Sequence, residues 1–213
     1  MRRFAHPRLS MLVLLIAGIC LSGCLATTAP GTRFYVLSAV DADENLPLPG
    51  GLNRPLSVQI LSLRLPQYLE RPQIVTRTGG HRLVLGEFDQ WGGNLKKNMI
   101  RVMAENLSRL LATAHVAMPP FRPPAPADFR LAVEVIRFEK GADGRVRLSA
   151  QWHLLDSADP QSAITQITEL VSDPVPAGQS YDDTVSAMSR VLGELSRVIG
   201  RQIIAQARPG PVS

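Results

Sequence analysis

The sequence predicts a single α+β domain in which a mainly antiparallel sheet carries two long amphipathic helices packed on one face. Residues 129–138 and 145–155 alternate apolar and polar side chains with a period of two, as strands with one buried face do. Residues 94–112 and 181–207 repeat apolar side chains every three or four positions, as amphipathic helices do. Each helix therefore has one apolar stripe to bury, and a sheet face can bury both.

Several shorter strands are predicted before the first helix. Residues 33–38 are rich in aromatic and β-branched side chains and form the first strand. Residues 55–65 place apolar side chains first in one register and then in the other, which predicts a strand with a bulge at its middle. Residues 73–77 and 82–85 flank a Thr-Gly-Gly-His turn and predict a hairpin.

Two connections and one more strand complete the predicted fold. Five of the eight residues from 119 to 126 are prolines, which lack the amide donor that a helix or central strand needs, so this segment is an extended connector. Residues 140–144 contain Asp-Gly and predict a hairpin loop. Residues 163–171 then form the third strand of an antiparallel meander.

Length, composition and charge exclude several classes of protein. A chain of 213 residues, 45% hydrophobic and 19% charged, can bury a core without staples and is not disordered throughout. Its two cysteines cannot make a disulfide framework or a four-thiolate zinc site. Beyond residue 23, twenty lysines and arginines are scattered among eighteen aspartates and glutamates. The net charge of +5 therefore does not predict a nucleic-acid-binding surface.

The chain begins with the organisation of a lipoprotein leader. Three arginines precede an apolar run over residues 9–21, which has the order of a secretory signal peptide and is too short to span a membrane. The run ends in Leu-Ser-Gly-Cys, which resembles a bacterial lipobox and implies that the leader, residues 1–23, is removed and that Cys24 is acylated. The alternative is an ordinary secreted protein with a chance cysteine near its cleavage site.

An acylated Cys24 would hold the protein at a membrane by a short tether. Removal of the leader leaves 190 residues and lowers the formal charge from +5 to +2, because the leader carries three arginines. Leu25, and not an aspartate, follows the cysteine, which favours the outer membrane under the Gram-negative sorting rule. Residues 24–32 form the acylated tether, whose last eight residues reach at most ~26 Å, so the domain over residues 33–208 lies close to its membrane.

The sequence shows no catalytic constellation and does not predict an enzyme. It lacks a nucleophile elbow, a zinc-protease motif, a phosphate-binding loop and a Cys-x-x-Cys motif. His81, His115 and His153 lie on three separate predicted elements without the spacing of a metal site. Asp182 and Asp183 fall in the first turn of a predicted helix, where negative charge suits the helix dipole. No cofactor is expected other than the covalent lipid on Cys24.

Six stretches of the chain resemble one family of bacterial lipoproteins. They are FYVL at residues 34–37, YLERPQIVTR at 68–77, LGEFDQW at 85–91, IRVMAENLSRLL at 100–111, FRLAVEVIRFE at 129–139 and VRLSAQWHLLD at 146–156. By these stretches the chain resembles the PqiC-type lipoproteins, the auxiliary lipoproteins of ABC-type and MCE-domain transport systems. Gly92 and Gly93 depart from the alanine and acid expected there, which concerns only the start of the following helix.

The resemblance implies a non-catalytic auxiliary subunit on the periplasmic face of the outer membrane. It implies a partner with an MCE domain that spans the periplasm, and a role in intermembrane lipid transport and envelope integrity. A ring-shaped partner favours a matching ring of this chain, a homo-oligomer. Two alternatives remain: a lipoprotein that carries a lipid or small molecule in its own cavity, and a structural lipoprotein of another outer-membrane machine.

The predicted docking residues for that partner are Tyr68, Leu69 and Arg71, together with Arg122 in the proline-rich connector. Loops held by a rigid scaffold are where binding usually occurs, and both segments are predicted to be such loops. The alternative for Tyr68 and Leu69 is local packing beneath the helices.

The role of Cys24 can be tested by the substitution Cys24→Ala. We expect the variant to leave the outer-membrane fraction, because without acyl chains nothing in the tether binds the bilayer. Fractionation of the envelope, with blotting for the chain, measures this. Unchanged outer-membrane fractionation of Cys24→Ala would contradict lipidation at this residue.

Overall fold

The computed structural model describes residues 31–40, 54–121, 123, 125–176 and 180–207. The chain divides into two compact units, residues 1–31 and 32–213, and the description below concerns the second. Within the described ranges, no helix combines the length and the apolar character needed to cross a bilayer.

The strands and helices that the sequence predicts are present in the described residues. They are β1 (Arg33–Tyr35), β2 (Val58–Arg64), β3 (Gln73–Thr78), β4 (Arg82–Trp91), α2 (Leu95–Leu110), β5 (Val116–Ala117), β6 (Phe129–Lys140), β7 (Arg145–Asp156), β8 (Ile164–Pro174) and α3 (Tyr181–Gln206), with 3-10 turns η1 (Gln67–Leu69) and η2 (Pro160–Ser162). β4 continues to Trp91 instead of ending at residue 85. β5 is absent from the prediction, because a two-residue strand has no periodicity.

The sheet is mixed, which corrects the predicted mainly antiparallel arrangement. β6, β7 and β8 form the predicted antiparallel meander, and β3 pairs antiparallel with β4. The pairs β1–β4, β2–β5, β2–β6 and β3–β6 are all parallel. β6 is parallel to β2 because α2, which follows β4, returns the chain to the end of the sheet where β2 begins. β6 then starts at that end and runs in the same direction as β2.

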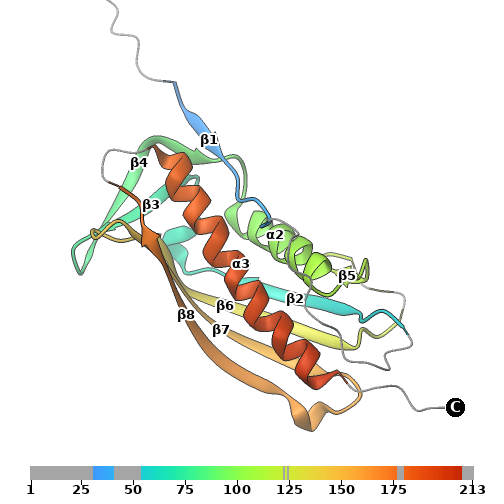
Figure 1. The fold of residues 1–213 in the computed structure, drawn as a ribbon. Helices are drawn as coiled ribbons and strands as arrows, with labels where there is room; N and C mark the ends of the chain where they lie inside the picture. Colours follow the sequence, from blue (N-terminus) through green and yellow to red (C-terminus); the bar gives the residue numbers. More distant parts are fainter. Residues whose placement is uncertain (1–30, 41–53, 122, 124, 177–179, 208–213) are drawn as a thin grey trace, which may run out of the picture. The chain divides into compact units, whose positions relative to one another are not determined.

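The alternation of side chains along the strands is confirmed. On β7, every second residue from Val146 to Leu154 is buried, including Trp152, whereas the residues between them are partly exposed. The bulge predicted within residues 55–65 is also present, since the register of β2 against β6 shifts between Ile60 and Ser62. Both helices lie on the same face of the sheet (Figure 1) and cover the buried side chains.

The two helices begin at residues whose side chains cap the first turn. Asn94 accepts a hydrogen bond from the backbone nitrogen of Lys97 at the start of α2, and Ser180 accepts one from Asp182 at the start of α3. Asp182 and Asp183 lie in the first turn of α3, as predicted, and oppose the positive end of its dipole. The local sequence therefore sets where both helices start.

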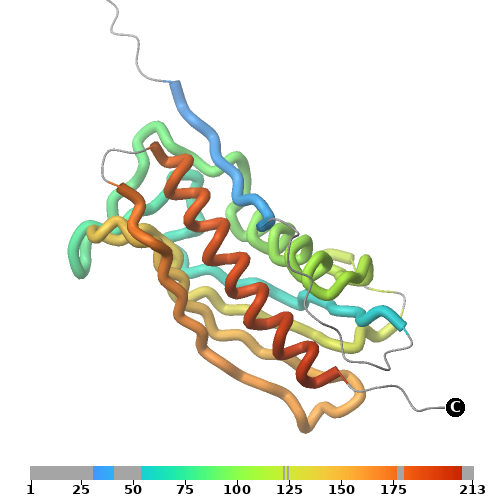
Figure 2. Tube along the Cα trace, in the orientation of Figure 1, coloured from blue at the N-terminus to red at the C-terminus, as the bar shows by residue number. Residues whose placement is uncertain are grey.

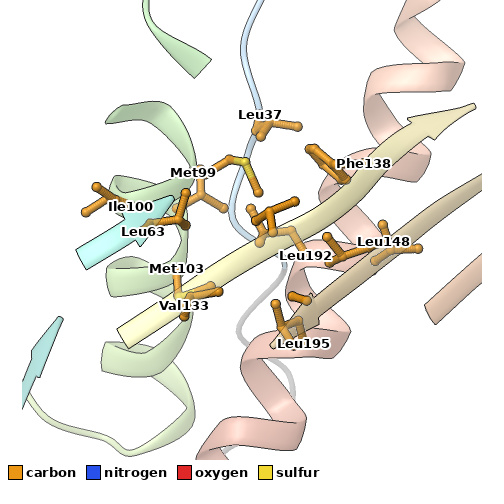
Figure 3. Close-up of a cluster of buried hydrophobic side chains, with 14 of the residues drawn as sticks. Leu37, Leu63, Met99, Ile100, Met103, Val133, Phe138, Leu148, Leu192 and Leu195 are labelled. Atoms are coloured by element: carbon orange, nitrogen blue, oxygen red, sulfur yellow. The ribbon is translucent and has the colours of Figure 1, made fainter. Parts of the chain in front are cut away.

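Residues 36–40, called here the crossing segment, follow β1 and run down to the helix layer (Figure 2). Leu37 in this segment is fully buried. Its side chain lies in the core with Met99 of α2, Phe138 of β6 and Leu192 of α3 (Figure 3). The crossing segment is thus part of the hydrophobic core and not a loose connection.

Side chains of α2 take the place of a strand partner for the crossing segment. The backbone nitrogen of Leu37 donates to Oδ1 of Asn98 over 2.7 Å, and that of Val40 donates to Oδ1 of Asn106 over 3.1 Å. The two asparagines are eight residues apart, which is about 12 Å along a helix. The amides of Leu37 and Val40 are three residues of extended chain apart, which is about 10 Å. The spacing of the two asparagines along α2 therefore matches the spacing of the two amides.

Helix α3 holds the crossing segment from the other side. The backbone nitrogen of Ser38 donates to Oγ of Ser189 over 3.1 Å. Gly193 leaves room for Val40, because a Cβ atom on this glycine would overlap Cγ1 of the valine. Both helices are therefore shaped around this segment.

Burial of the crossing segment predicts a contrast between two neighbouring residues. Leu37→Ala should lower the free energy of unfolding by roughly 2–5 kcal/mol, since it leaves a cavity at a fully buried site. Val36→Ala, at a position that is 57% exposed, should change it by less than about 0.5 kcal/mol. Urea unfolding of the two variants measures both values, and equal effects would show that the segment does not pack as described.

Candidate docking site

The sheet has two ends that strand β6 holds apart. β1, β4 and β3 join it at one end, where Thr76 pairs with Lys140. β2 and β5 join it at the other end, where Val58 pairs with both Phe129 and Val116. Since β6 has 12 residues, these ends, called here the β1 end and the β5 end, lie about 36 Å apart along the strand (Figure 1).

Three of the four predicted docking residues lie in the described part of the chain. Tyr68 and Leu69 belong to η1, between β2 and β3, and Arg71 follows with an exposed side chain. Leu69 is 2% exposed and packs in the core, as the packing alternative expects, whereas Tyr68 is half-buried. Arg122 and the acylation site Cys24 lie outside the described residues. The docking role of these side chains stays a prediction.

A fully buried carboxylate holds Tyr68 in place. Glu139 of β6 accepts hydrogen bonds from the Tyr68 hydroxyl over 2.7 Å, from Nε of Arg77 over 2.8 Å and from Nε of Arg137 over 2.7 Å. Burial alone would raise the pKa of Glu139, but the hydrogen bonds from Arg77 and Tyr68 outweigh it and lower this pKa. Burial and the bond to Glu139 raise the pKa of Tyr68 to about 12. Tyr68 therefore stabilises the attachment of η1 to β6.

A second carboxylate fixes β1 to β4. Nε and Nη2 of Arg33 donate to the two oxygens of Asp89 over 2.8 and 2.9 Å, and the Tyr35 hydroxyl donates to Oδ1 over 2.8 Å. Asp89 is 4% exposed, and the hydrogen bond from Arg33 lowers its pKa despite burial. Because Arg33 is the first residue of β1, this bidentate pair fixes the start of that strand to the sheet.

An apolar groove of about 310 Å³ lies at the β5 end of the sheet. Its apolar lining includes Ala114, Val116, Ala117, Pro123 and Ala127, and its polar lining residues are Ser57 and His115. The proline-rich connector, residues 119–126, forms no helix or strand in its described residues, as predicted.

Phe121 lies in this connector and is the most exposed large apolar side chain among the described residues, at 74%. Other residues of the same connector, among them Pro123 and Pro126, line the groove, and a large exposed apolar side chain in such a connector is typical of a contact surface. The sequence indicates the proline-rich connector as a docking loop, but the groove itself forms only when β5 packs against it.

Asp128 fixes the end of the connector to β2. Its carboxylate accepts hydrogen bonds from the backbone nitrogen and Oγ of Ser57 over 2.8 and 2.7 Å, and it forms an ion pair with Arg54. Burial alone would raise the pKa of Asp128, but the bonds from Arg54 and Ser57 outweigh it and hold the pKa at about 2, below the usual 3.8. The groove is thus built on a fixed base.

The three histidines of the domain lie apart from one another. His81 is exposed in the β3–β4 turn, His115 is exposed and lines the β5-end groove, and Nδ1 of His153 bonds to Oγ1 of Thr165 over 2.8 Å. Within the described ranges, no group of three or more His, Cys, Asp and Glu side chains is placed to hold a metal ion.

The depressed pKa of Asp128 predicts a pH dependence of stability. Its folded pKa of about 2 lies below the ordinary 3.8, so its contribution of up to about 2 kcal/mol is complete above about pH 4 and is lost as the pH falls towards 2. Asp128→Asn should remove this part of the acid dependence, whereas Asp173→Asn, at an exposed site, should retain it. Thermal unfolding from pH 5 to pH 2 measures the difference, and parallel curves for Asp128→Asn and the native chain would refute it.

The fold resembles solved structures. A protein described only as uncharacterized is 23% identical, with a TM-score of 0.61, and the match covers 82% of this chain and 99% of that one. Protein XCC0632 from Xanthomonas campestris, of family DUF330, is 16% identical, also with a TM-score of 0.61, and the match covers 82% of this chain and 97% of that one. At these identities the likeness shows the fold alone. No curated protein matches the sequence.

A family model matches most of the domain. It describes the ABC-type transport auxiliary lipoprotein component, and the match extends over residues 35–200, from β1 to the last turns of α3. This range includes five of the six stretches on which the resemblance rests and all but Phe34 of the first, so the resemblance is confirmed. The chain belongs to the family of ABC-type transport auxiliary lipoprotein components, the PqiC-type lipoproteins.

Proposed function

We propose that this chain is an outer-membrane lipoprotein that serves, without catalysis of its own, as the docking subunit of an MCE-type intermembrane lipid transport system. In this proposal residues 1–23 are the leader, residues 24–32 the acylated tether and residues 33–208 the docking domain. The separation of the β1 end from the β5 end along β6 is the observation that carries it.

The β1 end faces the membrane in this proposal. The tether joins the domain at Thr32, and the eight residues after Cys24 reach at most ~26 Å. The adjacent Arg33 donates to both carboxylate oxygens of Asp89. The sheet itself therefore resists a pull on the tether.

The β5 end then points away from the bilayer and towards the interior of the periplasm. A partner that approaches from the inner membrane meets this end first. Its groove of about 310 Å³ is lined mainly by alanine, valine and proline side chains, with Ser57 and His115 as its polar members, and the apolar lining favours one or two aliphatic side chains of an extended partner segment. Phe121 of the proline-rich connector supplies the large exposed apolar surface on which interfaces depend.

The family description as a transport auxiliary component supports this assignment and gives the chain no chemical step of its own. A ring-shaped partner would engage several copies of this chain at once, which favours a matching ring.

Site-specific photo-cross-linking tests the docking surface. With a photoreactive phenylalanine analogue in place of Phe121, we expect irradiated cells to yield an adduct between this chain and the MCE-domain protein. The analogue at Phe34, which is 66% exposed at the β1 end, is the matched control and should give no such adduct. Mass spectrometry of the affinity-purified chain identifies the adducts. Absence of the partner at Phe121, or equal capture at Phe34, contradicts the proposal.

A further inference from the structure

A groove of about 730 Å³ lies between the N-terminal segment and α3. Residues of β1 and the crossing segment form one wall, and one stripe of α3 forms the other. It belongs to the β1 end of the sheet, on the helix side, because β1 pairs with β4 there. Its volume falls in the range of sites that bind small molecules.

The first wall is apolar and exposed. Phe34 and Val36 point away from the core and are 66% and 57% exposed, while Tyr35 and Leu37, which alternate with them, are buried. Val40 of the crossing segment continues the apolar lining beyond them. A phenylalanine and a valine left open to water, in an element that buries its other side chains, indicate a surface that contacts apolar material.

The second wall is polar and carries both signs of charge. Asp182, Ser186, Arg190, Glu194 and Arg197 follow one another at helical spacing and line the groove. Nη1 of Arg190 donates to Oγ of Ser186 over 2.9 Å, while Arg197 forms an ion pair with Glu194. The charges of Asp182, Arg190, Glu194 and Arg197 sum to zero. A wall with both signs of charge favours a zwitterionic ligand more than an anionic one.

We propose that this groove binds a phospholipid with a zwitterionic headgroup. The acyl chain lies along Phe34, Val36 and Val40, and Arg190 donates to the phosphate, which presents the oxygen acceptors that guanidinium groups bind. The inference rests on the anchoring at Cys24 proposed above, since Phe34 lies ten residues beyond that cysteine and is held within ~33 Å of the bilayer. The site takes a lipid from the membrane surface and is separate from the docking groove at the β5 end.

The test uses the full-length lipidated chain in intact cells, with the photoreactive phenylalanine analogue at Phe34. After irradiation, peptide mass spectrometry should find adducts with the mass of a zwitterionic phospholipid. The analogue at Phe121 is the control and should give none. Arg190→Ala should reduce the Phe34 adduct about tenfold, as expected for the loss of a hydrogen bond to a charged group. Arg201→Ala, an exposed arginine of α3 outside the groove, should leave it unchanged.

Five outcomes overturn the inference. Four are the absence of a lipid adduct at Phe34, an equal adduct at Phe121, an adduct to the chain's own acyl groups on Cys24, and adducts richer in anionic phospholipid than the surrounding membrane. A lipid adduct that Arg190→Ala does not reduce reflects nearness to the bilayer alone and also overturns it.

A second pair of variants tests the apolar wall without the analogue. Val36→Asp places a charge in the groove, whereas Val171→Asp places one at an equally exposed valine of β8, at 54%. Only Val36→Asp should reduce the phospholipid that copurifies with the chain, and equal losses would refute the site. Thermal unfolding of both variants confirms that they fold. Lipid capture at Phe34 and partner capture at Phe121 are measured separately. A lipid adduct at Phe34 without a protein adduct at Phe121 therefore contradicts the proposed docking surface and leaves the lipid site standing.

Discussion

The crossing segment must have its backbone hydrogen-bonded without a neighbouring strand, and this requirement shapes both helices. A buried peptide group without a partner costs about 1–3 kcal/mol. Asn98 and Asn106 accept from the amides at its two ends, and Arg101 and Arg109, which are also eight residues apart, donate to the carbonyl groups of the same positions. Asn106 is fully buried and also donates to Ser196 of α3 over 3.3 Å, so the polar contacts continue across the helix pair. The segment, α2 and α3 therefore hold one another in a single arrangement.

The same arrangement sets the geometry of the binding surfaces. With Leu37 buried between the helices, the alternation along β1 turns Phe34 and Val36 outward, where they face the exposed stripe of α3. The β5-end groove forms where β2 accepts the short strand β5 on its free edge. Strand β6 connects the two regions and separates them, since it pairs with β2 along one half and with β3 at its far end.

Carboxylates fix the places where strands meet without a tight turn. Asp89 connects β1 to β4, Glu139 connects η1 and β3 to β6, and Asp128 connects β2 to the start of β6. Parallel neighbours are not joined by hairpins, so their register depends on such side-chain contacts as well as on the ladder. Removing one partner of a well-buried pair typically costs about 3–5 kcal/mol, because the remaining charge stays buried. Glu139, with no exposed surface, is the clearest case, and its partner Tyr68 shows why part of the predicted docking loop is structural.

The sequence by itself determined the three strands of the meander, the two helices, the bulge near Ile60 and the start of α3, because each follows from neighbours within a few residues. Side-chain periodicity states which face of an element is buried, but not which element covers it or in which direction a neighbouring strand runs. The parallel pairing of β2 and β3 with β6 was therefore decided only by the tertiary structure. The same holds for the partners of Asn106 and Glu139, which lie 66 and 71 residues away in the chain at Val40 and Tyr68. Both grooves likewise join segments distant in sequence, because a concave surface exists only once separate elements have packed.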